Sequence, residues 1–302
     1  MKEFIVEPDY ENCRLDRFLR EKFYFHQGLI CKAIRNKDIL LNNAKTKEGE
    51  KLKNGDKISI YEKFVVNTPS KPEREISAFY LEKIKKAVIH QDENILVLNK
   101  PYGICVQGGD GVDVCIIDIL QEIFGTEIRI VHRVDKNTSG VMLFARNKKT
   151  AASLAESFRD CKVEKEYLAI LDGVPRDSSG QITTRTSTIY LKDHNGSKAV
   201  LDDNGDLGIS DYKVLSSNAQ EIKSLVLFLP KTGRMHQIRI HARELGTPIM
   251  GDEKYNNKSI KGEKLQLIAR KITIPGFGSF EIPKLPEHFT KIMQSCNLTC
   301  EE

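Results

Sequence analysis

Polar side chains crowd into residues 132–140, HRVDKNTSG, which stand between two apolar stretches. Asp135 lies between Arg133 and Lys136, and these two cations should keep its carboxylate ionised at neutral pH. An ionised carboxylate on a loop can act as a nucleophile or as a general base. The alternative is structural, because Asp135 and Thr138 are also residue types that cap a tight turn. The segment alone leaves both interpretations open.

A second polar cluster occupies residues 231–241, KTGRMHQIRIH, and contains Arg234, His236, Arg239 and His241. Basic clusters are usually solvated faces, but histidines interleaved with apolar residues favour a lined cleft. His236 and His241 are five positions apart, which puts them on different faces of a helix and on opposite faces of a strand. The seven cysteines include no CxxC pair. We therefore expect neither a metal site nor a disulfide framework.

Two other patterns suggest chemistry that their spacing does not support. The triplet KTG at 231–233, with Ser210 and Lys213 upstream, is reminiscent of serine acyl-enzymes. In those enzymes the serine motif comes early, at a helix start, with an SDN between, whereas Ser210 lies in a strand-like stretch. Residues 97–111 contain Lys100 and three glycines but not the spacing of a phosphate-binding loop. We predict a strand, a Pro–Gly turn and a flexible loop there.

Four segments, in this order, resemble the RluA-type pseudouridine synthases. They are NKPYGICVQGG at 99–109, HRVDKNTSGVMLFARN at 132–147, KEY at 165–167 and TGRMHQIRIHARELGTPIMGDEKY at 232–255. LQLIA at 265–269 resembles a third, weaker motif of that family, and the N-terminal residues resemble the ribosomal-protein-type alpha-L RNA-binding domain. That pairing, with the glycine-rich VQGGDG, is most similar to the RluC branch. The resemblance covers nearly the whole chain.

The resemblance implies an active site made from three of these segments. The match to HRxDxxTSG places the family's catalytic aspartate at Asp135, and the KxY match places its active-site tyrosine at Tyr167. The HQIR match places the arginine that pairs with the carboxylate at Arg239. Gln107 and Ile268 stand where relatives often have histidine, and Val134 replaces the usual leucine. These departures bear on the choice of substrate and not on the reactive positions.

The implied reaction is the isomerisation of a uridine within RNA, with large-subunit ribosomal RNA as the expected substrate. It needs no redox change and no external group, so we expect no cofactor. Arg239 would orient the carboxylate of Asp135, and Tyr167 would offer a flat face for uracil and a hydroxyl near its carbon-5. Because a stacked base is out of reach, the uridine must be flipped out. Arg133 is a candidate to fill the vacated stack.

Composition and charge are compatible with this function. The chain has 302 residues, 40% of them hydrophobic, and a formal charge of +5, which is mildly basic and compatible with a polyanionic partner. No apolar stretch approaches the roughly 18 residues of a membrane span, and the first residues, MKEFIVEPDY, do not form a signal peptide. We expect a soluble, cytoplasmic protein that binds RNA and no membrane.

The residue pattern predicts an α+β protein with two domains and a linker. Residues 1–65 form a small RNA-binding domain with helices at 14–23 and 29–37 and strands at 38–43 and 56–61, and residues 66–79 form the linker. Residues 80–302 form the catalytic domain. Regular βαβ alternation is absent there, so we expect a mixed, mostly antiparallel sheet. Its predicted strands include 140–145, 165–173, 181–191, 223–230 and 265–274, and its helices lie at 147–160 and 235–245.

Residues 14–37 contain seven basic and two acidic residues, a local excess of +5. Phosphate contacts from such a cluster would give salt-dependent RNA binding, although an ordinary solvated helix face is the alternative. The residues assigned to RNA binding are Arg14, Arg17, Lys32, Arg35 and Lys37, together with Arg133, Arg234 and His236 from the two polar clusters.

Overall fold

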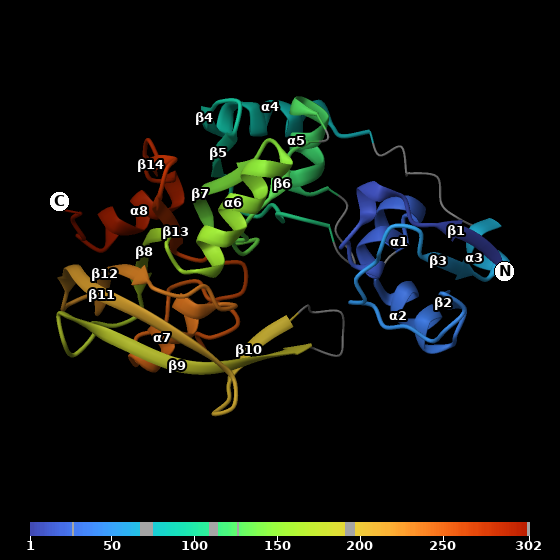
Figure 1. The fold of residues 1–302 in the computed structure, drawn as a ribbon. Coiled ribbons are helices and arrows are strands. Elements are labelled where there is room, and N and C mark those ends of the chain that lie inside the picture. Colours follow the sequence, from blue (N-terminus) through green and yellow to red (C-terminus); the bar gives the residue numbers. More distant parts are fainter. Residues whose placement is uncertain (26, 67–74, 109–113, 126, 191–196, 301–302) are drawn as a thin grey trace. The chain divides into compact units, whose positions relative to one another are not determined.

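The computed structural model describes residues 1–25, 27–66, 75–108, 114–125, 127–190 and 197–300 (Figure 1). The chain divides into two compact units, an N-terminal unit, Met1–Glu75, and a C-terminal unit, Ile76–Glu302. Each unit has a hydrophobic core of its own. Most of the predicted linker, residues 67–74, lies outside the described residues.

The N-terminal unit packs two helices on a three-stranded antiparallel sheet of order β1-β3-β2. In α1 (Leu15–Phe23) the predicted apolar stripe is buried, and the arginines of the opposite face are exposed. The other predicted elements are also present, as α2 (Gln27–Arg35), β2 (Ile39–Leu41) and β3 (Lys57–Ile60). The residue pattern did not predict β1 (Lys2–Ile5), the 3-10 helix Pro8–Tyr10 or α3 (Glu62–Val66).

The C-terminal unit is built on an 11-stranded sheet of order β10-β9-β11-β12-β8-β13-β7-β5-β4, with β14 beside β13 and β6 beside β7. Of the strand pairs that the structure describes, only β7 and β13 are parallel. The predicted mixed, mostly antiparallel α+β fold is therefore confirmed.

The strands of this sheet are β4 (Val88–Gln91), β5 (Ile95–Lys100), β6 (Arg129–Ile130), β7 (Ser139–Ala145), β8 (Glu164–Leu171), β9 (Ser179–Tyr190), β10 (Ser197–Leu201), β11 (Asp206–Asn218), β12 (Lys223–Pro230), β13 (Leu267–Ile274) and β14 (Gly278–Glu281). The helices are α4 (Ala78–Ala87), α5 (Ile116–Phe124), α6 (Lys148–Arg159), α7 (Gln237–Glu244) and α8 (Glu287–Ser295). The residue pattern did not predict α4, α5, α8, β10 or β14. It indicated a strand-like stretch around Ser210 but not the bounds of β11.

Helices cover both faces of the β5–β7 half of the sheet because these strands are apolar on both sides. Alternate residues such as Val97 and Leu143 pack in one core cluster with Leu154 of α6 and Phe289 of α8. The residues between them, such as Leu98 and Phe144, pack in a second cluster with Ile84 of α4 and Ile119 of α5. Continuous apolar runs of this kind are typical of strands buried on both faces.

Helix α7 belongs to another cluster, over β8 and β12. Its Ile238 and Ala242 pack in the same cluster as Ala169 of β8 and as Val226 and Phe228 of β12. The first residue of the helix, Gln237, donates to Ile209 O at 3.0 Å and to Ser210 Oγ at 2.9 Å. These contacts fix the start of α7 against β11.

Gly140 allows the parallel contact between β7 and β13. Its φ is +112°, and a Cβ at this position would lie 2.1 Å from the carbonyl oxygen of Ala269. No other residue type fits so close to a neighbouring backbone. The loop that carries Asp135 therefore leads into a strand whose position is set by glycine.

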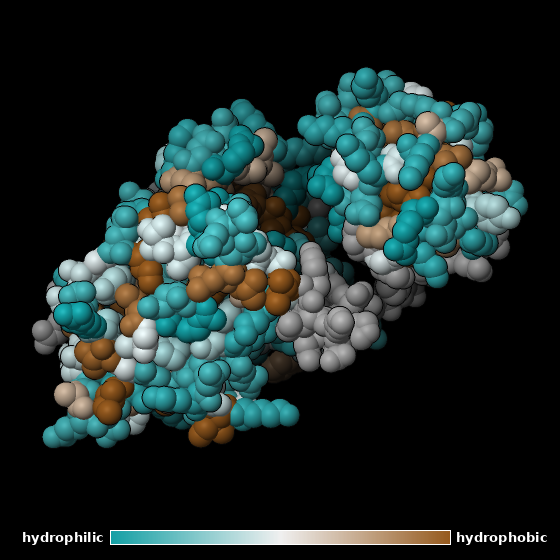
Figure 2. Space-filling model, turned by 90° about the horizontal axis from the view of Figure 1, so that it is seen from below, coloured by the Kyte–Doolittle hydropathy of each residue, from teal (hydrophilic) through white to brown (hydrophobic). Residues whose placement is uncertain are grey.

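The face of the molecule seen in Figure 2 is mostly hydrophilic, with its hydrophobic residues in small patches. Among the helices of the described residues, none is long and apolar enough to cross a membrane.

Candidate active site

The loop that carries Asp135 connects β6 to β7 and is held by backbone contacts. Thr138 N donates to Asp135 O at 3.1 Å, so the turn closes through the main chain. Below the loop, Lys100 Nζ donates to Lys136 O at 3.0 Å, to Thr138 O at 2.8 Å and to Pro101 O at 3.1 Å. The carboxylate of Asp135 is left free to face another element.

Lys100 is fully buried at the end of β5. Burial lowers the pKa of its ammonium group to about 7, although the negative charge of Asp135 acts in the opposite direction. The sequence predicted a structural role for the surrounding segment, and the three carbonyl contacts of Lys100 are structural. They tie the Asp135 loop to the first motif of the chain.

Arg239 of α7 faces the carboxylate of Asp135. Its Nη1 donates to Asp135 Oδ2 at 3.0 Å. Its other edge is bidentate to Asp252, with Nε to Oδ2 at 2.8 Å and Nη2 to Oδ1 at 2.7 Å. Burial acts to lower the pKa of Arg239, but Asp252 and Asp135 together raise it above its ordinary value. The guanidinium is therefore charged and fixed in one orientation.

Asp252 is the partner that sequence reasoning missed. Its side chain is fully buried, and Oδ1 also accepts the backbone N–H groups of Lys254 at 3.0 Å and Tyr255 at 3.2 Å. The preceding Gly251 has φ +73°, and a Cβ there would lie 2.2 Å from the carbonyl oxygen of Lys264. The Gly–Asp pair within TPIMGDEKY was the signal that could have indicated a constrained carboxylate.

His236 lies beside Asp135, with Nε2 3.7 Å from Asp135 Oδ2. It adopts a left-handed backbone conformation, φ +53°, directly before α7, which is a costly geometry for a residue other than glycine. Burial first, and then the nearby Arg239 and Lys254, lower its pKa to about 4 against the opposing charge of Asp135. The imidazole is therefore uncharged at neutral pH. We call Asp135, Arg239, Asp252 and His236 the Asp135 centre.

Tyr255 supports His236 from the other side. Its hydroxyl donates to Ala199 O at 3.0 Å and accepts from Ala199 N at 2.9 Å, and it lies 2.7 Å from His236 Nδ1. These contacts hold the imidazole of His236 in place, with Nε2 toward Asp135.

Tyr167 lies on β8, where its half-buried side chain packs on the cluster that holds α7. Burial, with a smaller contribution from the charge of Asp135, raises the pKa of its hydroxyl to about 12. The phenol is therefore protonated at neutral pH and lies within the electrostatic reach of Asp135. The structure thus brings all three residues of the predicted catalytic set into one region of the C-terminal unit.

The other residues predicted to bind RNA are exposed. Arg133 extends from the Asp135 loop, and Arg234, before α7, donates through Nε to Leu207 O at 2.9 Å. In the N-terminal unit, Arg14 pairs with Asp16 at 3.0 Å and Arg17 with Glu21 at 2.7 Å. Lys32, Arg35 and Lys37 are exposed and, among the described residues, have no carboxylate within 4.0 Å.

The alternatives from the sequence do not assemble into sites. Ser210 is fully buried in β11, where Gln237 donates to its hydroxyl, and Lys213, three positions on, projects from the other face of the strand. His132 accepts the backbone N–H of Leu143 at 2.9 Å and stacks on Phe158, which is a structural role. In the part of the chain that the structure describes, no three His, Cys, Asp or Glu side chains are grouped so as to hold a metal.

Comparison with known proteins agrees with this architecture. Residues 94–244 match the family model described as RNA pseudouridylate synthase. A protein of Rickettsia bellii named ribosomal large subunit pseudouridine synthase C is 36% identical over 259 residues, 82% of this chain and 84% of its own. Its namesake in Rickettsia prowazekii is 36% identical over 295 residues, 92% of this chain and 95% of its own.

A solved structure supports the same assignment. Human RNA pseudouridylate synthase domain containing 4 is 30% identical, with a TM-score of 0.61, and the alignment covers 73% of this chain and 97% of that one. The chain belongs to the RNA pseudouridylate synthase family and is of the RluA type, RluC-like. The matched segment contains Asp135, Tyr167 and Arg239, whereas Asp252 lies beyond its end.

Proposed function

We propose that this protein converts specific uridines of large-subunit ribosomal RNA to pseudouridine in the cytoplasm, without a cofactor. Support for the ribosomal substrate comes from the Rickettsia relatives, whose names refer to the large ribosomal subunit. The observation that carries the proposal is the pairing of Asp135 with Arg239 at 3.0 Å, in which the arginine is itself locked by buried Asp252.

Asp135 is the reactive group. In the isomerisation the N-glycosidic bond between uracil N1 and the sugar breaks, and a bond forms between carbon-5 of the base and the same sugar carbon. The carbon-5 proton leaves and N1 gains a proton, so atoms and charge balance without an oxidant. An ionised Asp135 can attack the sugar, attack the base or remove a sugar proton, and all three routes need the charged carboxylate that Arg239 stabilises.

Tyr167 and Arg133 act on the base. The ring of Tyr167 supplies a flat apolar face for uracil, and its protonated hydroxyl can form a hydrogen bond near carbon-5. The exposed Arg133, two residues from Asp135, fills the space in the RNA stack that the flipped uridine leaves. Substitution of Arg133 with Ala should weaken productive RNA binding more than it slows chemistry on bound substrate.

The N-terminal unit is an alpha-L-type RNA-binding domain in this proposal. Its support is the cationic stretch of residues 14–37, of which Lys32, Arg35 and Lys37 remain free of carboxylates among the described residues. Arg17 can exchange its exposed partner Glu21 for phosphate at little cost, and the exposed Arg14 can contact phosphate while it keeps Asp16. Residues 80–302 carry the chemistry.

The decisive experiment is a map of pseudouridine in ribosomal RNA from cells with and without the gene. We expect specific large-subunit positions to lose pseudouridine when the gene is absent and to regain it with the wild-type gene but not with Asp135→Asn. An unchanged map would overturn the ribosomal substrate. If the Asp135→Asn gene restores pseudouridine at the positions that lost it, the role of Asp135 is overturned.

A further inference from the structure

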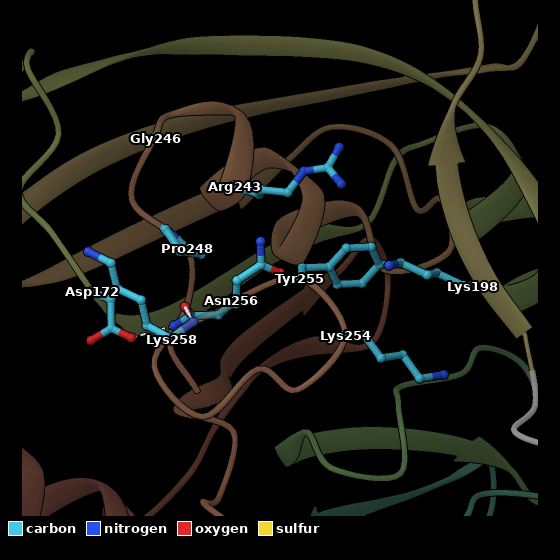
Figure 3. Close-up of a pocket in the computed structure, with 10 residues that line it drawn as sticks. Asp172, Lys198, Arg243, Gly246, Pro248, Lys254, Tyr255, Asn256 and Lys258 are labelled. Carbon is cyan, nitrogen blue, oxygen red and sulfur yellow. Dashed lines mark hydrogen bonds between the residues drawn. The ribbon is translucent and has the colours of Figure 1, made fainter. Parts of the chain in front are cut away.

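A cationic pocket lined in part by Tyr255 adjoins the Asp135 centre, because the Tyr255 hydroxyl contacts His236. Its volume is about 300 Å³, at the lower end of the range for small-ligand sites. Lys198 reaches toward the Tyr255 ring from β10, and Arg243 projects from α7 (Figure 3). Lys254 and the exposed Lys258 follow Asp252 in the same segment and complete the cationic part of the lining.

Two of these cations lie near one aromatic ring, and a third lies close to them. Lys198 Nζ lies 5.1 Å from the centroid of the Tyr255 ring, and Arg243 Cζ lies 5.9 Å from it. Lys254 Nζ donates to Ser197 O at 2.8 Å, next to Lys198 in the chain. Burial first and then Arg239 lower the pKa of Lys254, Asp135 and Asp252 oppose this shift, and Lys198 adds a smaller repulsion. Lys254 and Lys198 therefore repel each other in the free protein.

The pocket's own carboxylate does not neutralise them. Asp172 is engaged by Lys223 at 2.8 Å and by the side-chain amide of Asn256. Within the described part of the chain, neither Lys198 nor Lys254 has a carboxylate within 4.0 Å. Arg243 pairs with Glu244 at 2.8 Å, and that glutamate is exposed at the rim. The Tyr255 end of the pocket is therefore positively charged and open to an anion.

We propose that this pocket binds a backbone phosphate of the substrate RNA, at a linkage close to the target uridine. Lys and Arg are the side chains that bind phosphate, and release of counterions from RNA adds to the affinity. Tyr255 ties the pocket to the chemistry, because its hydroxyl contacts His236 and its ring lies 5.0 Å from Arg239 Cζ. A phosphate bound in this pocket relieves the repulsion among the cations and holds the RNA strand beside Asp135. This inference rests on the proposed function.

The first test removes two pocket cations that do not belong to the Asp135 centre. The double variant Lys198→Gln, Arg243→Gln should raise KM for an RNA fragment about tenfold and leave kcat at saturating RNA within about twofold. The slope of log affinity against log salt should fall by one to two units, about one for each phosphate that is no longer neutralised. The matched control, Lys83→Gln with Lys86→Gln on exposed positions of α4, removes the same charge and should change neither quantity.

The second test removes the phosphate charge from the RNA. A series of fragments carries one neutral methylphosphonate linkage each, placed in turn on either side of the target uridine. At one linkage the neutral group should lower the affinity of the wild-type protein about tenfold. At that linkage it should not lower the affinity of the double variant any further. This non-additivity is the signature of a direct interaction in a double-mutant cycle. Additive losses at every linkage, or an unchanged salt slope, would overturn the pocket.

The outcomes also separate this inference from the proposed function. If the wild-type protein converts the fragment and the double variant has the same KM and salt slope, the synthase activity stands and the phosphate site is overturned. Wild-type protein that converts no RNA removes the proposed function itself. A double variant with lower kcat at unchanged KM would assign the two cations to chemistry and would also overturn the phosphate site.

Discussion

The Asp135 centre and the basic stretch of residues 14–37 both depend on charged side chains, but they hold them in opposite ways. In the Asp135 centre the charges come from three separate segments, and each has a fixed partner, such as Asp252 for Arg239 at 2.7 Å. In the basic stretch the cations are close in sequence and mostly exposed. Several of them, such as Lys32 and Arg35, have no carboxylate partner among the described residues.

The difference shows that this protein uses buried charge pairs for precise geometry and exposed cations for affinity. A buried charge pair has one geometry, so loss of one partner leaves an uncompensated charge and a large penalty. Exposed cations contribute small and nearly interchangeable amounts, because salt and water screen them. Substitutions in the first region should therefore abolish function, whereas substitutions in the second should weaken it by degrees.

Asp135→Asn should have the largest effect. The change keeps the size of the side chain but removes the charge that every candidate route requires, so pseudouridine formation should fall below detection while RNA affinity stays within about twofold. Single-turnover conversion and filter binding on the same RNA measure the two. The control Asp177→Asn, at an exposed position of the same unit, should retain full activity. Measurable multiple turnover by Asp135→Asn would remove this residue from the mechanism.

Arg239→Ala should come next, with a rate loss of about 10³-fold, comparable to removal of a key charge-stabilising donor. It deprives Asp135 of its partner and leaves Asp252 buried without a counter-charge. Arg239→Lys keeps a charge but cannot make the bidentate contact, so it should recover stability better than rate. Equal rates for the Ala and Lys variants would show that charge at this position is irrelevant to the chemistry.

Asp252→Asn should act through Arg239. The amide keeps one acceptor for the backbone N–H groups but loses the ion pair, so unfolding free energy should fall by about 3 kcal/mol. Because Arg239 is then less restrained, the rate should fall about tenfold even at temperatures where the variant is fully folded. Urea titration and single-turnover kinetics separate the two effects. A variant that loses stability with no change in rate would limit Asp252 to a structural role.

Removal of the N-terminal unit should have a graded effect. A chain that begins at Ser77 should fold and convert short RNA in an Asp135-dependent way, since the C-terminal unit has its own core. It should bind long ribosomal fragments more weakly, with a salt slope smaller by about one unit for each phosphate that the N-terminal unit binds. If truncated and full-length chains show the same slope and site choice, the basic stretch is an ordinary solvated surface.

The effect with least consequence for the rate concerns the buried amino group of Lys100. Its pKa is about 7 in the folded protein against 10.5 when exposed, so the unfolded chain binds more protons between these values. Stability should then rise as pH increases from about 7 toward 10, by at most about 1.4 kcal/mol per pH unit. The midpoint of urea unfolding should increase more between pH 7 and pH 9 in the wild type than in Lys100→Met. Equal rises would mean that Lys100 is protonated throughout.

Local pattern alone determined much of this protein. The apolar stripe of α1 and the unbroken apolar run of β7 report burial directly, because a helix or a strand exposes its faces with a fixed period. The resemblance of its motifs to those of the RluA-type family, and not local pattern alone, predicted Asp135, Tyr167 and Arg239 as the catalytic set. Elements with weaker patterns, such as the short β10, were missed because pairing with a neighbouring strand, here β9, supplies what local propensity lacks.

Only the tertiary structure decided how these residues act together. Asp252 became the partner of Arg239 because Gly251 allows the chain to turn against Lys264, a contact between segments that no local spacing encodes. His236, assigned from sequence to RNA binding, lies against Asp135 uncharged, because burial lowers its pKa to about 4. Burial and charge pairing depend on neighbours distant in sequence, and for that reason the electrostatics of the site, unlike its residue types, emerge only in the folded chain.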